Sequence, residues 1–155
     1  MTTKVLLLVA HAPSPNTCAL AEAVLRGAQH PDVGAVRARW VQPLHATPDD
    51  VLQADAIILG TTENLGYMSG ALKDFFDRCY YPVLEHKQGM PCALYIRAGL
   101  DGTGTRRAIE GIVTGLRWSW VQAPLIMKGE WQDAFITQAE ELGLFMAAGL
   151  EAGII

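Results

Sequence analysis

The sequence predicts a three-layer α/β fold, in which a five-stranded parallel sheet of order 2-1-3-4-5 carries helices on both faces. Two observations predict this class. Short apolar runs, which suit strands covered on both faces, alternate along the chain with segments whose apolar residues recur at helical spacing. The length of 155 residues also suits one domain over residues 1–155, and fits five strands better than six.

The elements of the N-terminal third follow from local patterns. Val5–Ala10 is continuously apolar and is predicted to be the first strand. The polar loop His11–Thr17 leads into a helix predicted over Cys18–Gln29. Ala35–Val41 alternates small, apolar and basic residues, so we expect an exposed or edge strand. Pro48–Gln53 is predicted to be a short helix that is capped by the preceding threonine.

The stretch Gly60–Arg78 is the most informative part of the chain. The apolar run Ala56–Gly60 is predicted to be the third strand, and a polar loop with glycines follows it. A helix is then expected to about Arg78, with an apolar side on which Cys79 is interpreted as packing rather than as a nucleophile. In open α/β sheets, ligands bind where a strand ends in a loop that opens a helix. The mixture of hydroxyl, amide, aromatic and thioether side chains in this loop favours a planar polar heterocycle.

The C-terminal half continues the alternation of strands and helices. Its expected elements are a connecting segment Tyr80–Gly89, a fourth strand Met90–Arg97, a loop Ala98–Gly104, a helix Thr105–Leu116, a fifth strand within Trp118–Lys128 that Pro124 interrupts, and a long helix from Asp133 to about Ala152.

Composition excludes several classes of function. The formal net charge of −4 lacks the basic footprint of a nucleic-acid-binding protein. The three cysteines form no CxxC pair, so we expect free thiols and a cytoplasmic location. The four histidines are scattered without metal-ligand spacing, and the N-terminal apolar run is too short to insert into a membrane. Neither a GxSxG elbow nor a GxxxxGK[ST] phosphate loop is present.

The first loop suits an anion. Because the loops after the first, third and fourth strands meet at the carboxyl edge of such a sheet, the loop before the first helix lies at the candidate site. The helix N-terminus supplies unpaired amides, and Ser14, Asn16 and Thr17 add short polar side chains for a phosphate. The alternative is that Ser14 or Asn16 only caps the helix. His11 either leans over the ligand or has a structural role.

The third loop is less specific. Gly102 and Gly104 do not complete a GxGxxG fingerprint, because Arg107 stands where a third glycine would be. The glycines would let backbone amides approach the edge of a ring. Arg97 either offers its charge to an electron-rich ring or pairs with an acid such as Asp101.

The segment Gly60–Arg78, GTTENLGYMSGALKDFFDR, is similar to a strand–loop–helix motif of the flavodoxin-like superfamily, nearest the small NAD(P)H-dependent FMN oxidoreductases. In that group a Gly-Thr-Pro start is usual, and Thr62 stands here where the proline is common. The loop with Ser14, Asn16 and Thr17 resembles the phosphate element of the same group. The third loop is the least similar of the three.

The resemblance implies a flavodoxin-like fold, FMN as the cofactor and NAD(P)H as the co-substrate. It implies that the phosphate lies at the first loop and that the ring contacts the middle and third loops. The residues expected to bind the cofactor are His11, Ser14, Asn16, Thr17, Cys18, Thr61, Thr62, Glu63, Asn64, Tyr67, Met68, Arg97, Ala98, Gly99 and Gly102.

The aromatic content of the loops favours a reductase. Flavodoxin-type carriers usually hold the ring between two aromatic side chains, but Tyr67 has no aromatic counterpart in Ala98–Gly104. An open ring face favours electron transfer from NAD(P)H through the flavin to a quinone or similar small acceptor, with Arg97 and Tyr67 as tuning residues. The alternatives are a one-electron carrier that serves a protein partner, and a flavodoxin-like binding module without FMN. The apolar segment Gly143–Ile155 makes a homo-oligomer plausible.

Overall fold

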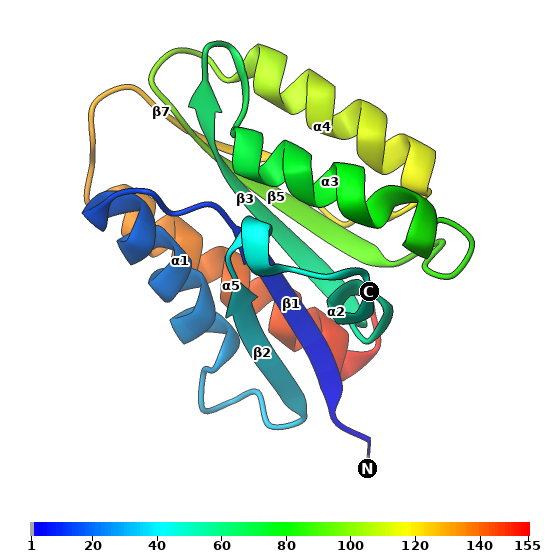
Figure 1. The fold of residues 1–155 in the computed structure, drawn as a ribbon. Coiled ribbons are helices and arrows are strands. Elements are labelled where there is room, and N and C mark those ends of the chain that lie inside the picture. The colour runs from blue at the N-terminus through cyan, green and yellow to red at the C-terminus, as the bar shows by residue number, and fades with distance from the viewer. Residues whose placement is uncertain (1) are drawn as a thin grey trace.

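A parallel sheet of order β2-β1-β3-β5-β6 forms the centre of the protein, in a computed structural model that describes residues 2–155 (Figure 1). The strands are β1 (Lys4–Ala10), β2 (Val36–Val41), β3 (Ala56–Asn64), β4 (Tyr67–Met68), β5 (Pro91–Ala98), β6 (Ser119–Trp120) and β7 (Leu125–Lys128). The helices are α1 (Pro15–Ala28), the 3₁₀ helix η1 (Pro43–His45), α2 (Pro48–Leu52), α3 (Gly70–Val83), α4 (Thr103–Leu116) and α5 (Ala134–Ala152).

The predicted strand order is confirmed, with the fifth strand divided in two. β6 pairs with the start of β5 and β7 with its end, and both pairings are parallel. Pro124 lies between β6 and β7, where it cannot donate a ladder hydrogen bond. β2 is an edge strand, as its mixed sequence predicts.

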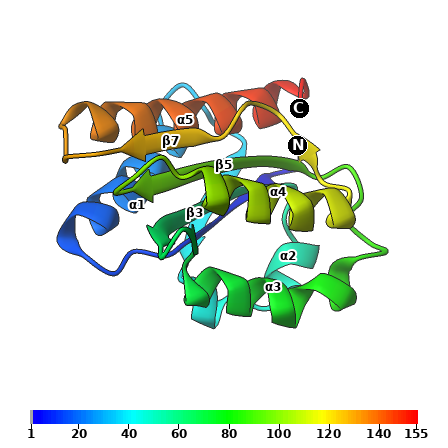
Figure 2. The same ribbon diagram turned by 90° about the horizontal axis from the view of Figure 1, so that it is seen from above.

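Helices cover both faces of the sheet (Figure 2). α1 and α5 pack on one face, around a core that includes Leu8, Leu20 and Met146. α3 and α4 cover the other face, where the core includes Phe75 and Val113. Within residues 2–155, no helix combines the length and apolar character needed to cross a membrane.

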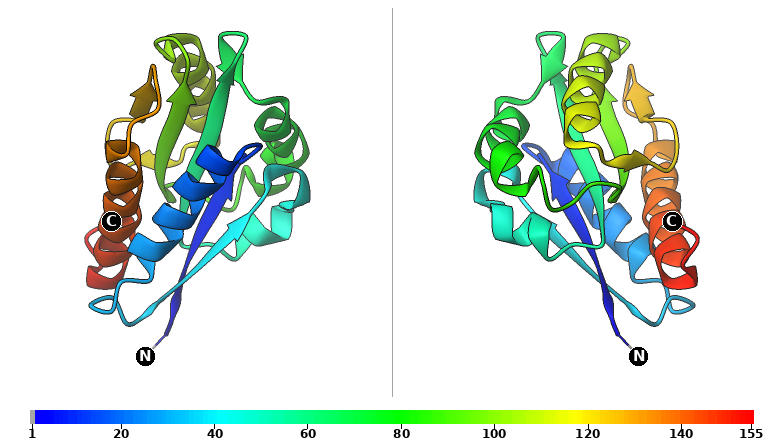
Figure 3. Two further views of the ribbon diagram at one scale, coloured as in Figure 1. Left: turned by 90° about the vertical axis from the view of Figure 1, so that its left-hand side faces the viewer. Right: turned by 90° about the vertical axis from the view of Figure 1, so that its right-hand side faces the viewer.

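The first and last helices lie side by side and approach closely (Figure 3). A Cβ atom at Gly27 of α1 would meet the backbone carbonyl of Glu140 in α5, and one at Gly143 of α5 would meet the carbonyl of Val24 in α1. The absence of side chains at these two glycines therefore lets the two backbones touch. The apolar stretch expected to support self-association is partly accounted for by this contact, because Met146 is fully buried.

Several predicted boundaries are wrong. The first helix begins at Pro15 rather than Cys18, because Ser14 caps it and proline fits the first helical position. The segment Tyr80–Gly89 is not wholly a connection, since α3 continues to Val83 with Pro82 in its last turn. α4 begins at Thr103, two positions before the prediction.

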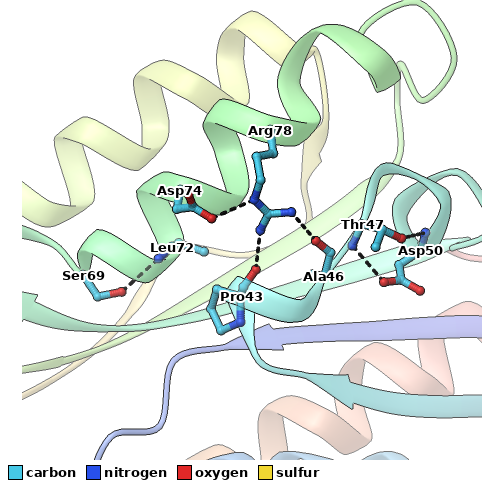
Figure 4. A network of polar contacts seen from close by, with 8 residues as sticks. All are labelled: Pro43, Ala46, Thr47, Asp50, Ser69, Leu72, Asp74 and Arg78. Carbon is cyan, nitrogen blue, oxygen red and sulfur yellow. Dashed lines mark hydrogen bonds and ion pairs between the residues drawn. The ribbon is translucent and has the colours of Figure 1, made fainter.

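Arg78 joins α3 to the segment that follows β2 (Figure 4). Its guanidinium donates to the carbonyl oxygens of Ala46 at 2.7 Å and Pro43 at 2.8 Å, and its Nε lies 2.7 Å from an oxygen of Asp74. The planar guanidinium provides several donors in a fixed geometry, so one side chain satisfies two carbonyls and an acid together.

The helices beside this network have side-chain caps (Figure 4). The predicted cap of α2 is confirmed: the hydroxyl of Thr47 accepts a hydrogen bond from the amide of Asp50 at 3.2 Å, and the Asp50 carboxylate accepts from the Thr47 amide at 2.9 Å. Ser69 caps α3 by accepting from the amide of Leu72 at 3.1 Å. α3 therefore starts at a fixed point, directly after the hairpin that ends β3.

Candidate functional site at the carboxyl edge of the sheet

The strand register brings the predicted loops to one edge of the sheet. Ala10 at the end of β1 is paired with Gly60 of β3, and Thr62 of β3 is paired with Arg97 of β5. Ala98, the last residue of β5, is paired with Lys128 at the end of β7. The loops that follow β1, β3, β5 and β7 therefore leave the sheet on the same side, as expected for the binding edge of an open α/β fold.

The first loop ends in a capping box at the N-terminus of α1. The hydroxyl of Ser14 accepts from the amide of Thr17 at 3.2 Å, and the hydroxyl of Thr17 accepts from the amide of Ser14 at 2.9 Å. The interpretation of Ser14 as a cap is thus confirmed, whereas Asn16 is exposed in the first turn. A helix N-terminus of this kind has a partial positive charge and remains suited to an anion.

The base of the same loop is held by neighbouring strands. The amide of His11 donates to the carbonyl of Gly60 at 3.0 Å, and the amide of Ala12 donates to Gln42 Oε1 at 3.4 Å. The thiol of Cys18 donates to the carbonyl of Ala12 at 3.5 Å. The segment after β2 therefore contributes to this site through Gln42, which sequence reasoning did not include.

A pocket of about 230 Å³ lies beside the first loop, between it and the segment after β2. Its lining consists of His11, Ala12, Gln42, Pro43, Leu44, His45 and Ala71. Burial lowers the pKa of His11, which keeps its imidazole neutral at pH 7. His11 thus faces a cavity as a neutral group that can donate or accept a hydrogen bond.

The middle loop is a β-hairpin, so the prediction that the strand ends at Gly60 and gives way directly to a loop is wrong. β3 continues to Asn64 and then pairs antiparallel with β4, with Glu63 opposite Met68 and Asn64 opposite Tyr67. Leu65 and Gly66 form the turn with φ values of 53° and 74°. Positive φ at both central residues is the pattern of a type I′ turn, which matches the twist of a two-residue hairpin. The threonines after Gly60 suit this longer strand because they are β-branched.

Glu63 joins the hairpin to the third loop. Its two carboxylate oxygens accept hydrogen bonds from the amides of Leu100 at 2.9 Å and Gly102 at 2.8 Å. Gly102 is the N-cap residue of α4 and has a φ of 70°, so the carboxylate lies at the positive end of that helix. The two loops expected to flank the ring are therefore held together by one side chain.

Arg97 contacts β7 and two aromatic rings. Its Nη1 donates to the carbonyls of Ala98 at 2.9 Å and Met127 at 3.0 Å, and the latter belongs to β7. The guanidinium also lies 5.0 Å from the ring centroid of Phe135 and 5.8 Å from that of Trp131. Within residues 2–155 it forms no ion pair with Asp101, so that alternative is wrong.

The other predicted residues divide into buried and accessible groups. Thr61, Met68 and Ala98 are buried, and the Thr61 hydroxyl accepts from the amide of Ser69 at 3.0 Å, which fixes the end of the hairpin. Tyr67 is 41% exposed. The remaining accessible residues of the two walls are Thr62, Asn64 and Gly99.

Tyr95 is a buried residue of this edge that sequence reasoning missed. It lies opposite Gly60 in the β3–β5 ladder, and its hydroxyl oxygen is 2.5 Å from where a Cβ of Gly60 would be. The hydroxyl is buried and has no hydrogen-bond partner among residues 2–155. A tyrosine within an apolar strand gives no sequence signal of this kind, because only the fold brings its ring end against Gly60.

The order of the strands and the position of these loops define the flavodoxin-like class of α/β proteins. The chain belongs to the NADPH-dependent FMN reductase family, whose model matches residues 40–135. This range includes the hairpin and the third loop but not the first loop. Over 101 residues the chain is 33% identical to a flavodoxin of Aquifex aeolicus (strain VF5), a match that covers 65% of this chain and 54% of the relative. The chain thus spans about half the length of that relative.

Solved structures share the whole fold. A flavodoxin from the domain Archaea superposes with a TM-score of 0.80 at 20% identity, covering 95% of this chain and 99% of the other. A WrbA-like flavodoxin from Agrobacterium tumefaciens gives a TM-score of 0.75 at 21% identity, with 97% and 99% covered. The two-electron reduced flavodoxin of Megasphaera elsdenii gives 0.75 at 19% identity, with 92% and 98% covered. At such identities the likeness establishes the fold and not the activity.

Proposed function

We propose that this protein binds FMN at the carboxyl edge of its sheet and passes electrons from NAD(P)H to a quinone or a similar small acceptor. The observation that supports this most directly is that three features lie at one edge of the sheet. They are the N-terminus of the 14-residue helix α1, the hairpin with exposed Tyr67 and the glycine-containing third loop. Membership of the NADPH-dependent FMN reductase family supports the same cofactor and donor.

The residues at this edge fit FMN chemically. The N-terminus of α1 favours the phosphate, and the hydroxyls of Ser14 and Thr17 already form hydrogen bonds there and can rotate toward an anion. Tyr67 offers an aromatic surface for the ring. The buried Tyr95 hydroxyl, which has no partner among the described residues, is the kind of group that a bound ligand satisfies.

Bound FMN supplies the redox chemistry, and the protein controls binding, orientation and access. Tyr67 covers one ring face in this proposal, and the segment Gly99–Gly102 brings no aromatic side chain to the other. Trp131, which follows β7, packs against Arg97 and Phe135. An uncovered face leaves room for a nicotinamide or a quinone to stack.

Arg97 can influence the flavin only at a distance in this arrangement. Its guanidinium is engaged by backbone carbonyls and aromatic rings, but its positive charge still lies at the edge where the ring is proposed to bind. A positive charge near an electron-rich ring favours its reduced form through Coulomb attraction.

The test is the visible spectrum of the purified protein, followed by anaerobic addition of NADPH and of NADH. We expect the absorption of oxidised flavin, and bleaching by one or both nucleotides. A colourless protein that takes up no added FMN would contradict the proposal and would favour a binding module without cofactor. Steady-state oxidation of the nucleotide with a soluble quinone then tests the acceptor class.

The second candidate is an electron carrier that serves a protein partner. Leu65 at the hairpin tip is fully exposed and Leu100 is 77% exposed, and both lie in the loops proposed to flank the flavin. Exposed apolar side chains beside a redox site suit transient docking of a protein. FMN that binds but is not reduced by either nicotinamide nucleotide would favour this function.

A further inference from the structure

The Tyr95 hydroxyl is a buried polar group with no partner in the part of the chain that the structure describes. The residue is 3% exposed, and the hydroxyl oxygen forms no hydrogen bond within residues 2–155. Leaving such a group unsatisfied is unfavourable, because it loses its hydrogen bonds to water and gains none in return. Native structures rarely keep such a group without a ligand, a water molecule or a functional reason.

The position of the hydroxyl relates it to the first loop. The ring lies across Gly60, whose neighbour in the sheet is Ala10, the last residue of β1. The carbonyl of Gly60 accepts from the amide of His11, the first residue of the loop. Burial raises the pKa of Tyr95, and Cys18 in the first turn of α1 is close enough to add to that rise. The hydroxyl thus lies under the loop and beside the first turn of α1, and it remains protonated and able to donate.

The loop above the hydroxyl is closed on itself. The hydroxyls of Ser14 and Thr17 occupy the amides at the start of α1 and bond to each other at 2.8 Å. An incoming anion would compete for the same amides, because its charge interacts more strongly with them than a neutral hydroxyl does. Opening the capping box would uncover the floor of the loop, where the Tyr95 hydroxyl is a donor that has no partner within residues 2–155.

We propose that Tyr95 is the floor of the phosphate subsite and donates a hydrogen bond to the phosphate when the loop His11–Cys18 rearranges around it. This inference rests on the proposed binding of FMN. Gly60 is part of the arrangement, since a side chain there would occupy the space of the Tyr95 ring end. The helix N-terminus attracts the anion, and the tyrosine adds a donor from the strand below.

The test uses Tyr95→Phe, which keeps the ring over Gly60 and removes only the hydroxyl. The dissociation constants of FMN and riboflavin are measured by fluorescence quenching, and the melting temperature of the FMN-free protein by circular dichroism. We expect the FMN-free variant to melt about 3 °C higher, because an unsatisfied group has been removed. We expect its FMN affinity to fall about tenfold or more and its riboflavin affinity to stay the same, because riboflavin lacks the phosphate.

Tyr80→Phe is the matched control. Tyr80 is partly buried in α3 with its hydroxyl against Gly115 of α4, on the other face of the sheet. Its FMN affinity should equal that of the wild type. An unchanged FMN affinity in Tyr95→Phe would overturn the inference, as would an equal loss for FMN and riboflavin or a lower melting temperature of the FMN-free variant. A wild-type protein that binds no FMN would instead overturn the proposed function, and this inference with it.

Discussion

The hydrogen bonds of Glu63 to the third loop should stabilise the whole carboxyl edge, and Glu63→Ala measures how much. The carboxylate accepts from the amides of Leu100 and Gly102 at 2.9 and 2.8 Å, and both amides lose their partner in the variant. A hydrogen bond to a charged group contributes about 1.5–3 kcal/mol when it is buried. Because Leu100 is exposed, water replaces part of the loss at that amide. We therefore expect a decrease of about 2 kcal/mol in the free energy of unfolding.

Glu63→Gln separates the two bonds. The amide side chain keeps one acceptor oxygen and places an NH₂ group opposite the second backbone amide. We expect about half of the loss seen with alanine, or about 1 kcal/mol. In a domain of 155 residues, 2 kcal/mol corresponds to a decrease in melting temperature of about 4–8 °C.

Urea denaturation and amide hydrogen exchange together test this reasoning. Exchange should accelerate at both Leu100 and Gly102 in Glu63→Ala, but at only one of the two amides in Glu63→Gln, because an amide that loses its acceptor becomes accessible through local opening. Glu130→Ala is the control, since Glu130 is exposed between β7 and α5 and its side chain forms no hydrogen bond or ion pair within the described chain. A loss in Glu63→Ala no larger than that of the control, with unchanged exchange at both amides, would refute the bridging role.

Three further substitutions test other contacts. Gly60→Ala should lower the free energy of unfolding by about 1–3 kcal/mol, since the new methyl group overlaps the buried Tyr95 ring; unchanged denaturation would contradict that packing. Arg78→Lys should lower it by about 2 kcal/mol, because an ammonium cannot reproduce the planar contacts to two carbonyls and an acid; equal urea midpoints would argue against the network. The pKa of Asp50 is lowered, despite burial that raises it, by bonds to Thr47 and Arg39. The stabilisation that the Asp50 carboxylate provides is therefore present above its unfolded pKa and is lost as the pH falls through the lower folded pKa. In acid titration, Asp50→Asn should consequently lose less of its free energy of unfolding below about pH 4 than the wild type does.

The order and type of the elements could be predicted because a strand that is buried on both faces has a continuous run of apolar residues. Val5–Ala10 and Met90–Arg97 are apolar runs that suit only covered strands, and both lie within 1 residue of the observed β1 and β5 at each end. The fifth strand was also expected to be interrupted at Pro124, which separates β6 from β7.

The middle loop could not be predicted in the same way. Its hairpin depends on a type I′ turn with leucine rather than the usual asparagine or aspartate at the first central position. A positive φ is unfavourable for a leucine, so the local sequence preference at Leu65 did not predict the turn. The hairpin is instead held by tertiary contacts, among them Glu63 with the third loop and the Gly66 carbonyl against Gly104.

The sequence predicted the positions of the candidate loops better than the contacts that their side chains make. The topology brings the expected loops together, but Glu63 bonds to the third loop, Arg97 turns toward β7 and Met68 enters the core. Tyr95 had no place in the prediction, since its importance comes from a pairing with Gly60 between strands far apart in sequence. Such contacts depend on the packed structure rather than on any local pattern.

The glycine contact between α1 and α5 makes the position of the first loop depend on the end of the chain. Without side chains at Gly27 and Gly143, there is no flexible layer between the two helices that could absorb a change in either. A substitution at Gly143 should therefore displace α1 and move its opposite end, where Ser14 and Thr17 form the capping box at the proposed anion site. If FMN binds as proposed, selection for altered FMN affinity should consequently recover variants in α5, far in sequence from the residues proposed to contact the phosphate.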